Sequence, residues 1–223
     1  MVVSMKHFTK AICVIDTCSI LNLDGIELAR DDVLRYIRQF FDVHVSDVIL
    51  DEFNRHRKQL GREEASYWSS TLSSKQFQPQ VLTSNETVIA PFYTHPPASF
   101  GAEDAGEHAN ARVAIELLLT KAAGHAIFVT DDLKACSAFL NKMRGSFPGI
   151  NLWSSADVVL YLGAILLTER RVTYDAIKNA LRDVYARRGS FANTDQYTSQ
   201  VIKRRKQSAE SLKLIAKIAN NWS

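Results

Sequence analysis

The sequence is poor in cysteine, and no apolar run in it is long enough to cross a membrane. The three cysteines, Cys13, Cys18 and Cys136, form no C-x-x-C pair, which argues against a disulfide framework and a zinc knuckle. The longest apolar run, residues 158–167, is interrupted by Tyr161 and Gly163 and is too short for a transmembrane helix. The first ten residues lack the apolar core of a secretory signal. These absences predict a soluble, cytoplasmic protein with no membrane partner.

The sequence also lacks an internal repeat and a low-complexity linker that would divide it into domains. Its 223 residues, 46% of them hydrophobic, suit one α/β domain with an appendage. Residues 1–167 carry 15 Lys and Arg against 19 Asp and Glu, whereas residues 168–223 carry 12 against 5. We therefore expect a main domain at 1–167 and a basic helical extension at 168–223. An acidic body with a basic arm suits a polyanionic ligand, although solvated helix faces would give the same division.

What the chain does contain is a repeated pattern in which an apolar strand ends at a carboxylate. Residues 11–15 run into Asp16, and a second strand, expected at 125–130, runs into Asp131 and Asp132. In open α/β sheets, ligands bind beyond the carboxyl ends of the strands. These acids are therefore candidates for chemistry. The alternative for Asp16 is that its side chain only caps the helix that follows.

The rest of the chain favours a sheet with helices on both of its faces. Short apolar runs predict further strands at 43–45 and 150–153, and Glu52 falls on a helix that follows the first of these. Strands that alternate with helices predict a three-layer α/β/α fold with a central, mainly parallel sheet. Residues 61–100 are the least regular part. The helices that we expect lie at 28–41, 62–73, 100–119, 133–143, 156–167, 173–187 and 199–220.

A further pair of acids, Asp104 and Glu107, stands at the start of the helix expected over 100–119. The helix dipole favours an acid there, which accounts for one of the two. Four acidic positions gathered at one edge of a sheet would raise one another's pKa unless a cation lay between them. Hard divalent ions, Mg²⁺ or Mn²⁺, prefer such oxygen ligands. Two such ions can activate a water and stabilise the leaving oxygen of a phosphodiester.

Taken together, these motifs resemble those of the PIN-domain ribonucleases. V-I-D-T-C-S-I-L, residues 14–21, is similar to the opening motif of the family, and Glu52 matches its second acid. D-A-G-E-H-A-N-A, residues 104–111, and V-T-D-D-L, residues 129–133, resemble the third and fourth motifs. The resemblance covers about residues 11–165. It implies a PIN-like fold and a metal-dependent endoribonuclease that uses Mg²⁺ or Mn²⁺ to hydrolyse RNA.

The resemblance also implies roles for individual residues. Its four catalytic, metal-binding acids would be Asp16, Glu52, Asp104 and Asp132. Some branches of the family carry G-E at the third motif, which makes Glu107 the alternative to Asp104.

The fourth motif has an alternative as well, because Asp131 is adjacent to Asp132 and would serve equally as a metal ligand. The resemblance assigns a supporting role to two hydroxyl side chains. Thr130 would orient the fourth acid, and Ser19 would lie beside the first.

Two basic clusters are candidates for contacts with RNA. One follows Glu52 along the chain and the other lies near the start of the last expected helix, with Tyr185, Phe191 and Tyr197 upstream as candidate stacking partners. The alternative is that these cations are solvated parts of helices, and that the tail is a docked cap. The two clusters consist of Arg55, Arg57 and Lys58, and of Lys203, Arg204, Arg205 and Lys206.

Other function classes fit the sequence less well. A haloacid-dehalogenase-type phosphatase needs a second Asp two residues after the first, where this chain has Cys18. A response-regulator receiver domain has its acidic pair near the first strand, whereas here the pair is late. The main rival is a non-catalytic PIN-like interaction module, because a fold does not guarantee an activity. The toxin of a toxin and antitoxin pair is a further alternative, although the small toxin members have no counterpart of the tail.

The C-terminal helices are also a candidate surface for a protein inhibitor or another protein partner. The sequence does not fix the oligomeric state, and a homodimer is the commonest closed assembly.

Overall fold

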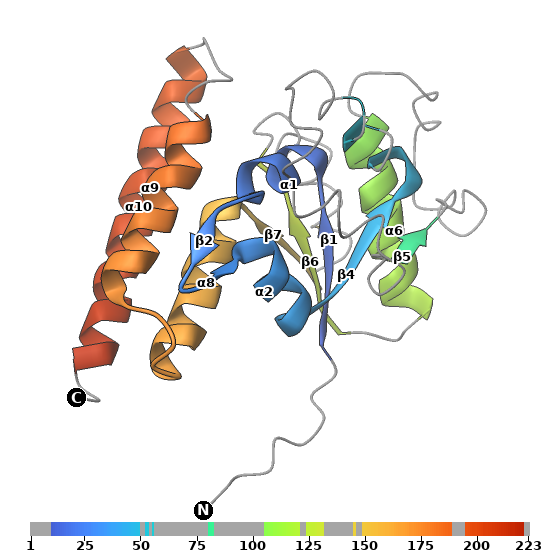
Figure 1. Ribbon diagram of the computed structural model, residues 1–223. Coiled ribbons are helices and arrows are strands. Elements are labelled where there is room, and N and C mark those ends of the chain that lie inside the picture. Colours follow the sequence, from blue (N-terminus) through green and yellow to red (C-terminus); the bar gives the residue numbers. More distant parts are fainter. Residues whose placement is uncertain are drawn as a thin grey trace, which may run out of the picture.

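A parallel sheet forms the centre of the computed structural model, which describes residues 10–49, 52, 53, 55, 80–82, 105–120, 124–131, 145, 149–188 and 195–220. The strand order is β5-β4-β1-β6-β7, and every neighbouring pair is parallel. The expectation of an α/β chain with a mainly parallel sheet is therefore confirmed (Figure 1). The strands are β1 (Ala11–Ile15), β4 (Phe41–Ser46), β5 (Gln80–Leu82), β6 (Ala126–Val129) and β7 (Ile150–Trp153).

Helices cover both faces of this sheet. Successive side chains of a strand point to opposite faces, so each strand contributes to two apolar cores. Cys13 and Ile15 of β1 belong to one apolar core, which also includes residues of α1 (Thr17–Leu23), α2 (Val33–Phe40) and α8 (Ser155–Thr168). Ile12 and Val14 belong to a second core, on the side of α6 (Ala105–Thr120). Burial on both faces explains why the central strands are continuous apolar runs rather than alternating ones.

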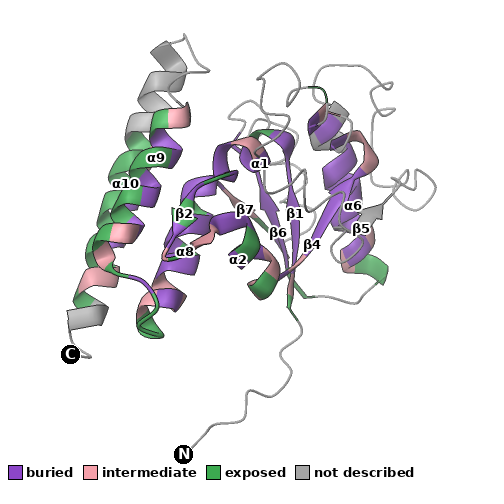
Figure 2. Ribbon diagram, viewed as in Figure 1, coloured by how far each residue is buried: buried purple, intermediate pink, exposed green. Residues whose placement is uncertain are grey.

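The two C-terminal helices, α9 (Tyr174–Arg188) and α10 (Asp195–Asn220), extend the first of these cores. Ile177, Val184 and Leu212 are buried in the same cluster as Ile15. Helix α8 is apolar nearly all round because the sheet lies on one side of it and α9 and α10 on the other. Figure 2 shows that the opposite faces of α9 and α10 are largely exposed. The boundary at residues 167 and 168 stays a prediction.

The approach of α9 to α8 is close enough to require a glycine. A Cβ placed on Gly163 would lie 2.9–3.0 Å from the side chain of Ile177. Only a residue without a side chain allows two helices to approach this closely without a shift. Gly163 therefore allows α9 to pack closely on α8, in addition to interrupting the apolar run of the sequence.

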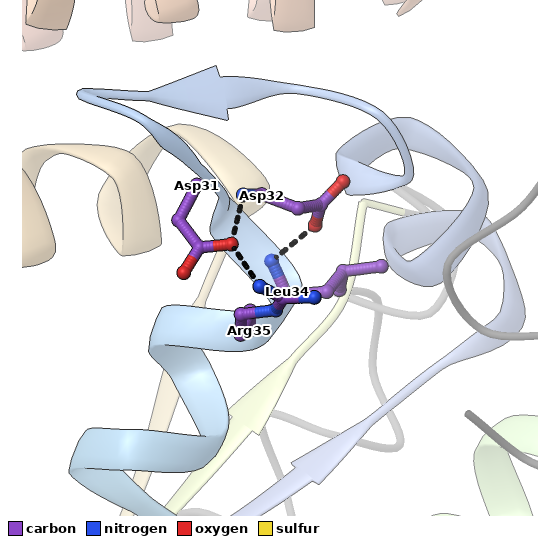
Figure 3. A network of polar contacts seen from close by, with 4 residues as sticks. All are labelled: Asp31, Asp32, Leu34 and Arg35. Carbon is purple, nitrogen blue, oxygen red and sulfur yellow. Dashed lines mark hydrogen bonds and ion pairs between the residues drawn. The ribbon is translucent and has the colours of Figure 1, made fainter. Parts of the chain in front are cut away.

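The expected helix over 28–41 is wrong at its N-terminal end, where the structure has a short hairpin. Strands β2 (Glu27–Leu28) and β3 (Asp31–Asp32) pair antiparallel, and Ala29 in the turn has a φ of 65°. Asp32 then caps α2, accepting a hydrogen bond from the Leu34 amide at 2.7 Å. Figure 3 shows this cap beside the ion pair of Asp31 with Arg35, which are 2.9 Å apart. The aspartates therefore stop the helix from extending further back.

Strand β5 was not expected, because it lies in the stretch that had no regular pattern. The helices expected at 62–73 and 133–143 lie outside the described residues. Within the described part of the chain, no helix is both long and apolar enough to span a membrane.

Asn110 of α6 joins the ends of two strands to that helix. Its side-chain amide donates to the Ile15 carbonyl at 2.9 Å, and its oxygen accepts from the Ser46 amide at 3.2 Å. The residue is fully buried. Both backbone groups lie at the carboxyl edge of the sheet, where the strands no longer satisfy one another. Asn110 therefore fixes the start of α6 relative to β1 and β4.

We expect Asn110→Ala to lower the free energy of unfolding by about 2 to 6 kcal/mol, because two buried backbone groups lose their partners at about 1 to 3 kcal/mol each. Denaturant unfolding followed by circular dichroism measures this loss. Asn151→Ala on β7 is the control, since Asn151 is exposed and an exposed position should change stability by about 0.5 kcal/mol or less. Equal effects of the two substitutions would contradict the assigned role.

Candidate functional site

Asp16 lies where the central strand ends, and its carboxyl group is buried. Its backbone amide donates to the Val129 carbonyl of β6 at 3.0 Å, so β1 and β6 stay paired up to this residue. Its Oδ1 accepts from the Ser19 amide at 2.6 Å, which makes Asp16 the N-cap of α1. The alternative that Asp16 caps the following helix is therefore confirmed for Oδ1. Capping does not account for the second carboxyl oxygen.

The second oxygen, Oδ2, is buried and has no hydrogen-bond partner among the described residues. Burial raises the pKa of Asp16 to about 7. The nearby hydroxyls of Thr130 and Ser19 lower the pKa, and the charge of Asp131 raises it. Among the described residues, the Ser19 Oγ atom is likewise buried and meets no hydrogen-bond criterion. A buried, unsatisfied carboxylate oxygen is costly and calls for an explanation.

Asp131 lies beside Asp16, but its oxygens are already hydrogen-bonded. Oδ2 accepts from the Asn22 side chain at 2.8 Å and from the Ser155 hydroxyl, and Oδ1 accepts from the Ser155 amide at 3.1 Å. Asn22 belongs to α1 and Ser155 begins α8, so this acid connects two helices to the end of β6. It is 5% exposed. These contacts give Asp131 a structural role in addition to its negative charge.

Glu52 reaches the same edge of the sheet from the chain after β4. Its Oε2 accepts from the Thr17 hydroxyl at 3.0 Å, one residue after Asp16. The carboxylate also lies against the start of α6. A Cβ placed on Gly106 would be 2.7 and 2.9 Å from its two oxygens, so a glycine is needed there for Glu52 to occupy this position.

Gly106, which belongs to the third acidic motif, lies against the carboxylate of Glu52. Gly106 lies between Asp104 and Glu107 in the sequence, and α6 starts at Ala105. Asp104 and Asp132 lie outside the described residues, as does the side chain of Glu107. In the described part of the chain, no group of three or more His, Cys, Asp or Glu is placed to hold a metal ion. Four chain segments of the predicted site nevertheless meet at one edge of the sheet.

Both residues that were expected to supply supporting hydroxyls lie at Asp16. Ser19 lies beside Asp16, to which it donates its backbone amide. Thr130 also acts on Asp16, since a hydrogen bond from its side chain lowers the pKa of that acid. Thr130 reaches Asp16 because β6, which it follows, is the neighbour of β1 in the sheet. The contact that the resemblance implies between Thr130 and Asp132 lies outside the described residues.

Three residues of this site were not predicted: Thr17, Asn22 and Ser155. Each binds an acid rather than supplying one, and each is buried. A sequence pattern marks the acids by their place after apolar strands, but the partner of an acid comes from elsewhere in the fold. The sequence signal that could have identified Asn22 is its position as a polar residue between Leu21 and Leu23.

The C-terminal extension contacts this site through Arg187 of α9. Its guanidinium donates to the Asn22 carbonyl at 3.3 Å and to the Asp24 carbonyl. These carbonyls lie at the C-terminal end of α1, where a cation complements the helix dipole. Asn22 in turn donates its side chain to Asp131. The extension is thus joined to the acids through one residue of α1.

The basic cluster of α10 is divided between packing and solvent. Arg205 lies over the ring of Tyr185, 5.2 Å from its centroid, and donates to the Tyr185 carbonyl at 3.3 Å. Arg204 is half-buried, whereas Lys203 and Lys206 are exposed.

The proposal that Tyr185 stacks on RNA is wrong, because this ring is 7% exposed and its hydroxyl hydrogen-bonds Ser208 at 2.7 Å. Arg55 is exposed. Arg57, Lys58 and Phe191 lie outside the described residues, as does the side chain of Tyr197.

Comparison with models of protein families, with curated proteins and with solved structures found no match in any of the three. The resemblance to PIN-domain ribonucleases therefore stays a prediction. The geometry around Asp16, Glu52 and Asp131 is the basis for inferring a function.

The raised pKa of Asp16 makes stability depend on pH. Its ordinary value is about 3.9, so between about pH 4 and 7 the unfolded chain has lost this proton and the native state keeps it. In EDTA, stability should therefore fall by about 1.4 kcal/mol per pH unit over this window, or about 4 kcal/mol in all, and level off above pH 7. Denaturant unfolding at half-unit pH steps measures the slope.

Asp16→Asn isolates this contribution, because asparagine caps a helix as well as aspartate does and does not titrate. Subtracting its pH profile from that of the parent protein removes the contribution of the histidines and the other acids. The difference should follow the titration of one group, and the variant should be the more stable protein at pH 8. Parallel profiles would show that Asp16 is ionised throughout.

Proposed function

We propose that this protein is a metal-dependent endoribonuclease with a PIN-like fold. The observation that supports this most is the unsatisfied Oδ2 of Asp16, buried at the carboxyl edge of a parallel sheet. Ligands bind at this edge in open α/β sheets. Glu52 approaches from one side and Asp131 from the other. Such a set of carboxylates suits a cation better than any neutral ligand.

The residues fit Mg²⁺ or Mn²⁺ by the chemistry of their donors. Both ions prefer hard oxygen ligands, and they are commonly held by one or two protein carboxylates together with water and substrate oxygens. Asp16 Oδ2 is available for this purpose, whereas Asp131 supplies charge through an otherwise satisfied carboxylate. Glu52 is half-buried and its hydrogen bond from Thr17 uses Oε2. Asp16 and Glu52 would therefore bind the ion.

A bound ion would supply Lewis-acid stabilisation of charge on the phosphodiester and a lowered pKa for an attacking water. The residues of the chain hold and orient the acids. Ser19 fixes the rotamer of Asp16 through Oδ1, Thr17 fixes Glu52, and Asn22 and Ser155 hold Asp131. Such fixed partners keep a site within the small tolerance that catalysis needs.

The exposed cations of α10 support a nucleic acid as the substrate. Lys203 and Lys206 are exposed on a helix that packs against α8, whose first residue contacts Asp131. Cations near an acidic, metal-dependent site attract the phosphates of a strand that the acids would repel. The choice of RNA over DNA follows from the resemblance of the motifs.

A non-catalytic module is the second candidate, and one observation favours it. Both oxygens of Asp131 are occupied by protein donors, as expected of an acid that only stabilises the fold. In that case Asp16 would be a helix cap with a raised pKa, and the edge of the sheet would bind a protein partner or inhibitor.

RNA cleavage is the direct test of the first candidate. We expect the purified protein to cut pooled single-stranded RNAs internally in Mn²⁺ or Mg²⁺ and not in EDTA. Asp16→Asn should lower the rate by at least roughly a hundredfold, since the loss of one strong stabiliser of transition-state charge commonly costs that much. Asp183→Asn on α9 removes one exposed carboxylate away from the site and should leave the rate unchanged. Cleavage that survives EDTA or Asp16→Asn would exclude this mechanism.

Metal binding has a readout that does not depend on turnover. A ligand that binds only the native state stabilises it by about 2.7 kcal/mol at a hundred times its dissociation constant. Millimolar Mn²⁺ should therefore raise the melting temperature of the parent protein and of Asp183→Asn. Asp16→Asn should lose this shift, and Gly106→Ala should weaken it because the added methyl displaces Glu52. A melting temperature that ignores Mn²⁺ would favour the non-catalytic module.

A further inference from the structure

A row of four lysines runs along one face of helix α10. Residues three, four and seven apart on an α-helix lie on the same side of it, and the spacings within this row are three, seven and four residues. At about 1.5 Å per residue, the row spans about 21 Å. All four side chains are exposed, and we call them the lysine row: Lys203, Lys206, Lys213 and Lys217.

The opposite face of α10 packs against the rest of the protein, so the lysine row faces solvent. Leu212 is buried in the same core as α8 and α9, and the Ser208 hydroxyl hydrogen-bonds that of Tyr185 at 2.7 Å. Figure 2 shows the exposed side of α10 turned away from the sheet. The lysines are therefore not used to pack the helix, and their charges are available to a partner.

The face that carries the lysine row is strongly positive. Glu210 is the only acid between residues 203 and 217. It pairs with Lys213 at 2.8 Å, and both side chains are exposed. The other three lysines of the row have no acidic partner among the described residues. Such a concentration of one sign of charge attracts a polyanion.

The chemistry of this face favours a nucleic acid over a membrane or a protein. A helix that lies on a membrane buries a broad apolar face in it, whereas Leu214 is the one large apolar side chain that is exposed between residues 203 and 217. Protein interfaces are enriched in aromatic residues and depleted in lysine. Exposed lysines are, by contrast, a common means of contacting the phosphates of a nucleic acid.

The absence of aromatic residues from this stretch favours a double strand over a single one. Surfaces that bind single strands combine cations with aromatic rings on which the bases stack. Residues 203–217 contain no aromatic residue, and the ring of Tyr185, which Arg205 contacts, is buried. In a duplex the bases are already stacked, and proteins recognise double-stranded RNA mostly by its shape and its backbone.

The N-terminal end of the lysine row lies on the same side of the molecule as the proposed site. Arg205 lies over the ring of Tyr185, and Arg187, two residues further along α9, donates to the carbonyl of Asn22. Asn22 in turn binds Asp131. Figure 1 shows that α10 begins at the end of the molecule where the strands end and runs back toward the end where they begin. A duplex along α10 therefore has one of its ends near the acids.

We propose that the lysine row binds a double-stranded stem of the RNA substrate, a proposal that rests on the proposed function. The ammonium groups contact phosphates of the stem and read no base, so the sequence of the stem does not matter. The substrate class is then an RNA in which a stem adjoins the single strand that is cut.

Binding in EDTA tests the row separately from cleavage. The probes are a fluorescein-labelled RNA duplex of about 16 base pairs, the length that a double-stranded-RNA-binding domain spans, and one of its strands alone. Fluorescence anisotropy on the full chain measures both affinities. With four contacts, we expect the duplex to bind at least about fivefold more tightly at about 0.1 M salt, since each contact contributes a salt slope of about 0.9 on a duplex and about 0.7 on a single strand. A duplex of scrambled sequence should bind equally well.

A double variant and a charge-matched control locate the effect. Lys206→Gln with Lys217→Gln should weaken duplex binding at least about tenfold and lower the salt slope by about 1.8, because two phosphate contacts are lost. Lys10→Gln with Arg30→Gln is the control, since it removes two exposed cations that lie before β1 and in the turn between β2 and β3. The control should keep the affinity and the salt slope of the parent protein. Circular dichroism checks that each protein is folded.

Each outcome separates this proposal from the proposed function. Equal binding of the duplex and the single strand overturns the stem site, as does an affinity and salt slope that survive the double variant in folded protein. Sedimentation with phosphatidylserine vesicles that the double variant abolishes, while duplex binding is kept, also overturns it and assigns the row to a membrane surface. If Mn²⁺-dependent cleavage is nevertheless present, the nuclease assignment stands without the stem site. A duplex preference that depends on the row supports the site, and when no cleavage accompanies it, the nuclease assignment alone fails.

Discussion

The burial of the Asp16 carboxyl group at the end of the central strand is the constraint on which the surrounding structure depends. Strands β4 and β6 flank β1 and hydrogen-bond it along its length, so water does not reach the residue that follows it. A carboxylate in such a place is costly unless it is neutralised, hydrogen-bonded or bound to a cation. Ser19 satisfies one oxygen. A bound metal would compensate the negative charge at the other oxygen. Without a metal, burial of that charge raises the pKa of Asp16.

The C-terminal helices have a part in this arrangement, although the motifs that predict the site all lie before them in the chain. Arg187 holds the C-terminal end of α1, and α8 lies between the sheet and α9. Helix α1 begins at the residue after Asp16 and carries Asn22, which binds Asp131. Movement of α9 would therefore reach both acids through one short helix. In physical terms, the extension stabilises the geometry of the site as well as the core.

Much of the fold could be predicted from the sequence, because burial on both faces leaves long apolar runs that end abruptly. Strands β1 and β7 and helices α8 and α9 lie within a residue or two of their expected bounds. The hairpin before α2 could not be predicted, since Asp31 and Asp32 fit the pattern of an amphipathic helix. In the structure, the Asp32 side chain caps α2 and the Asp31 side chain accepts the Asp32 amide. Asp16 and Asp131 were found from their place after strands. Their partners were not, because Thr17, Asn22 and Ser155 contact them through pairings that only the folded chain creates.

Two carboxylates at adjacent strand ends thus have different surroundings, and the difference bears on function. Asp131 accepts three hydrogen bonds from protein donors, which hold its carboxyl group between α1 and α8. Asp16 accepts the Ser19 amide at Oδ1, but no described residue satisfies its Oδ2, so Asp16 is the acid that can bind a ligand here. The charge of Asp131 raises the pKa of Asp16 and would equally attract a cation to it. An acid whose oxygens all accept hydrogen bonds from the protein can stabilise a fold. An acid must keep an oxygen available to a ligand if it is to take part in chemistry at the edge of the sheet.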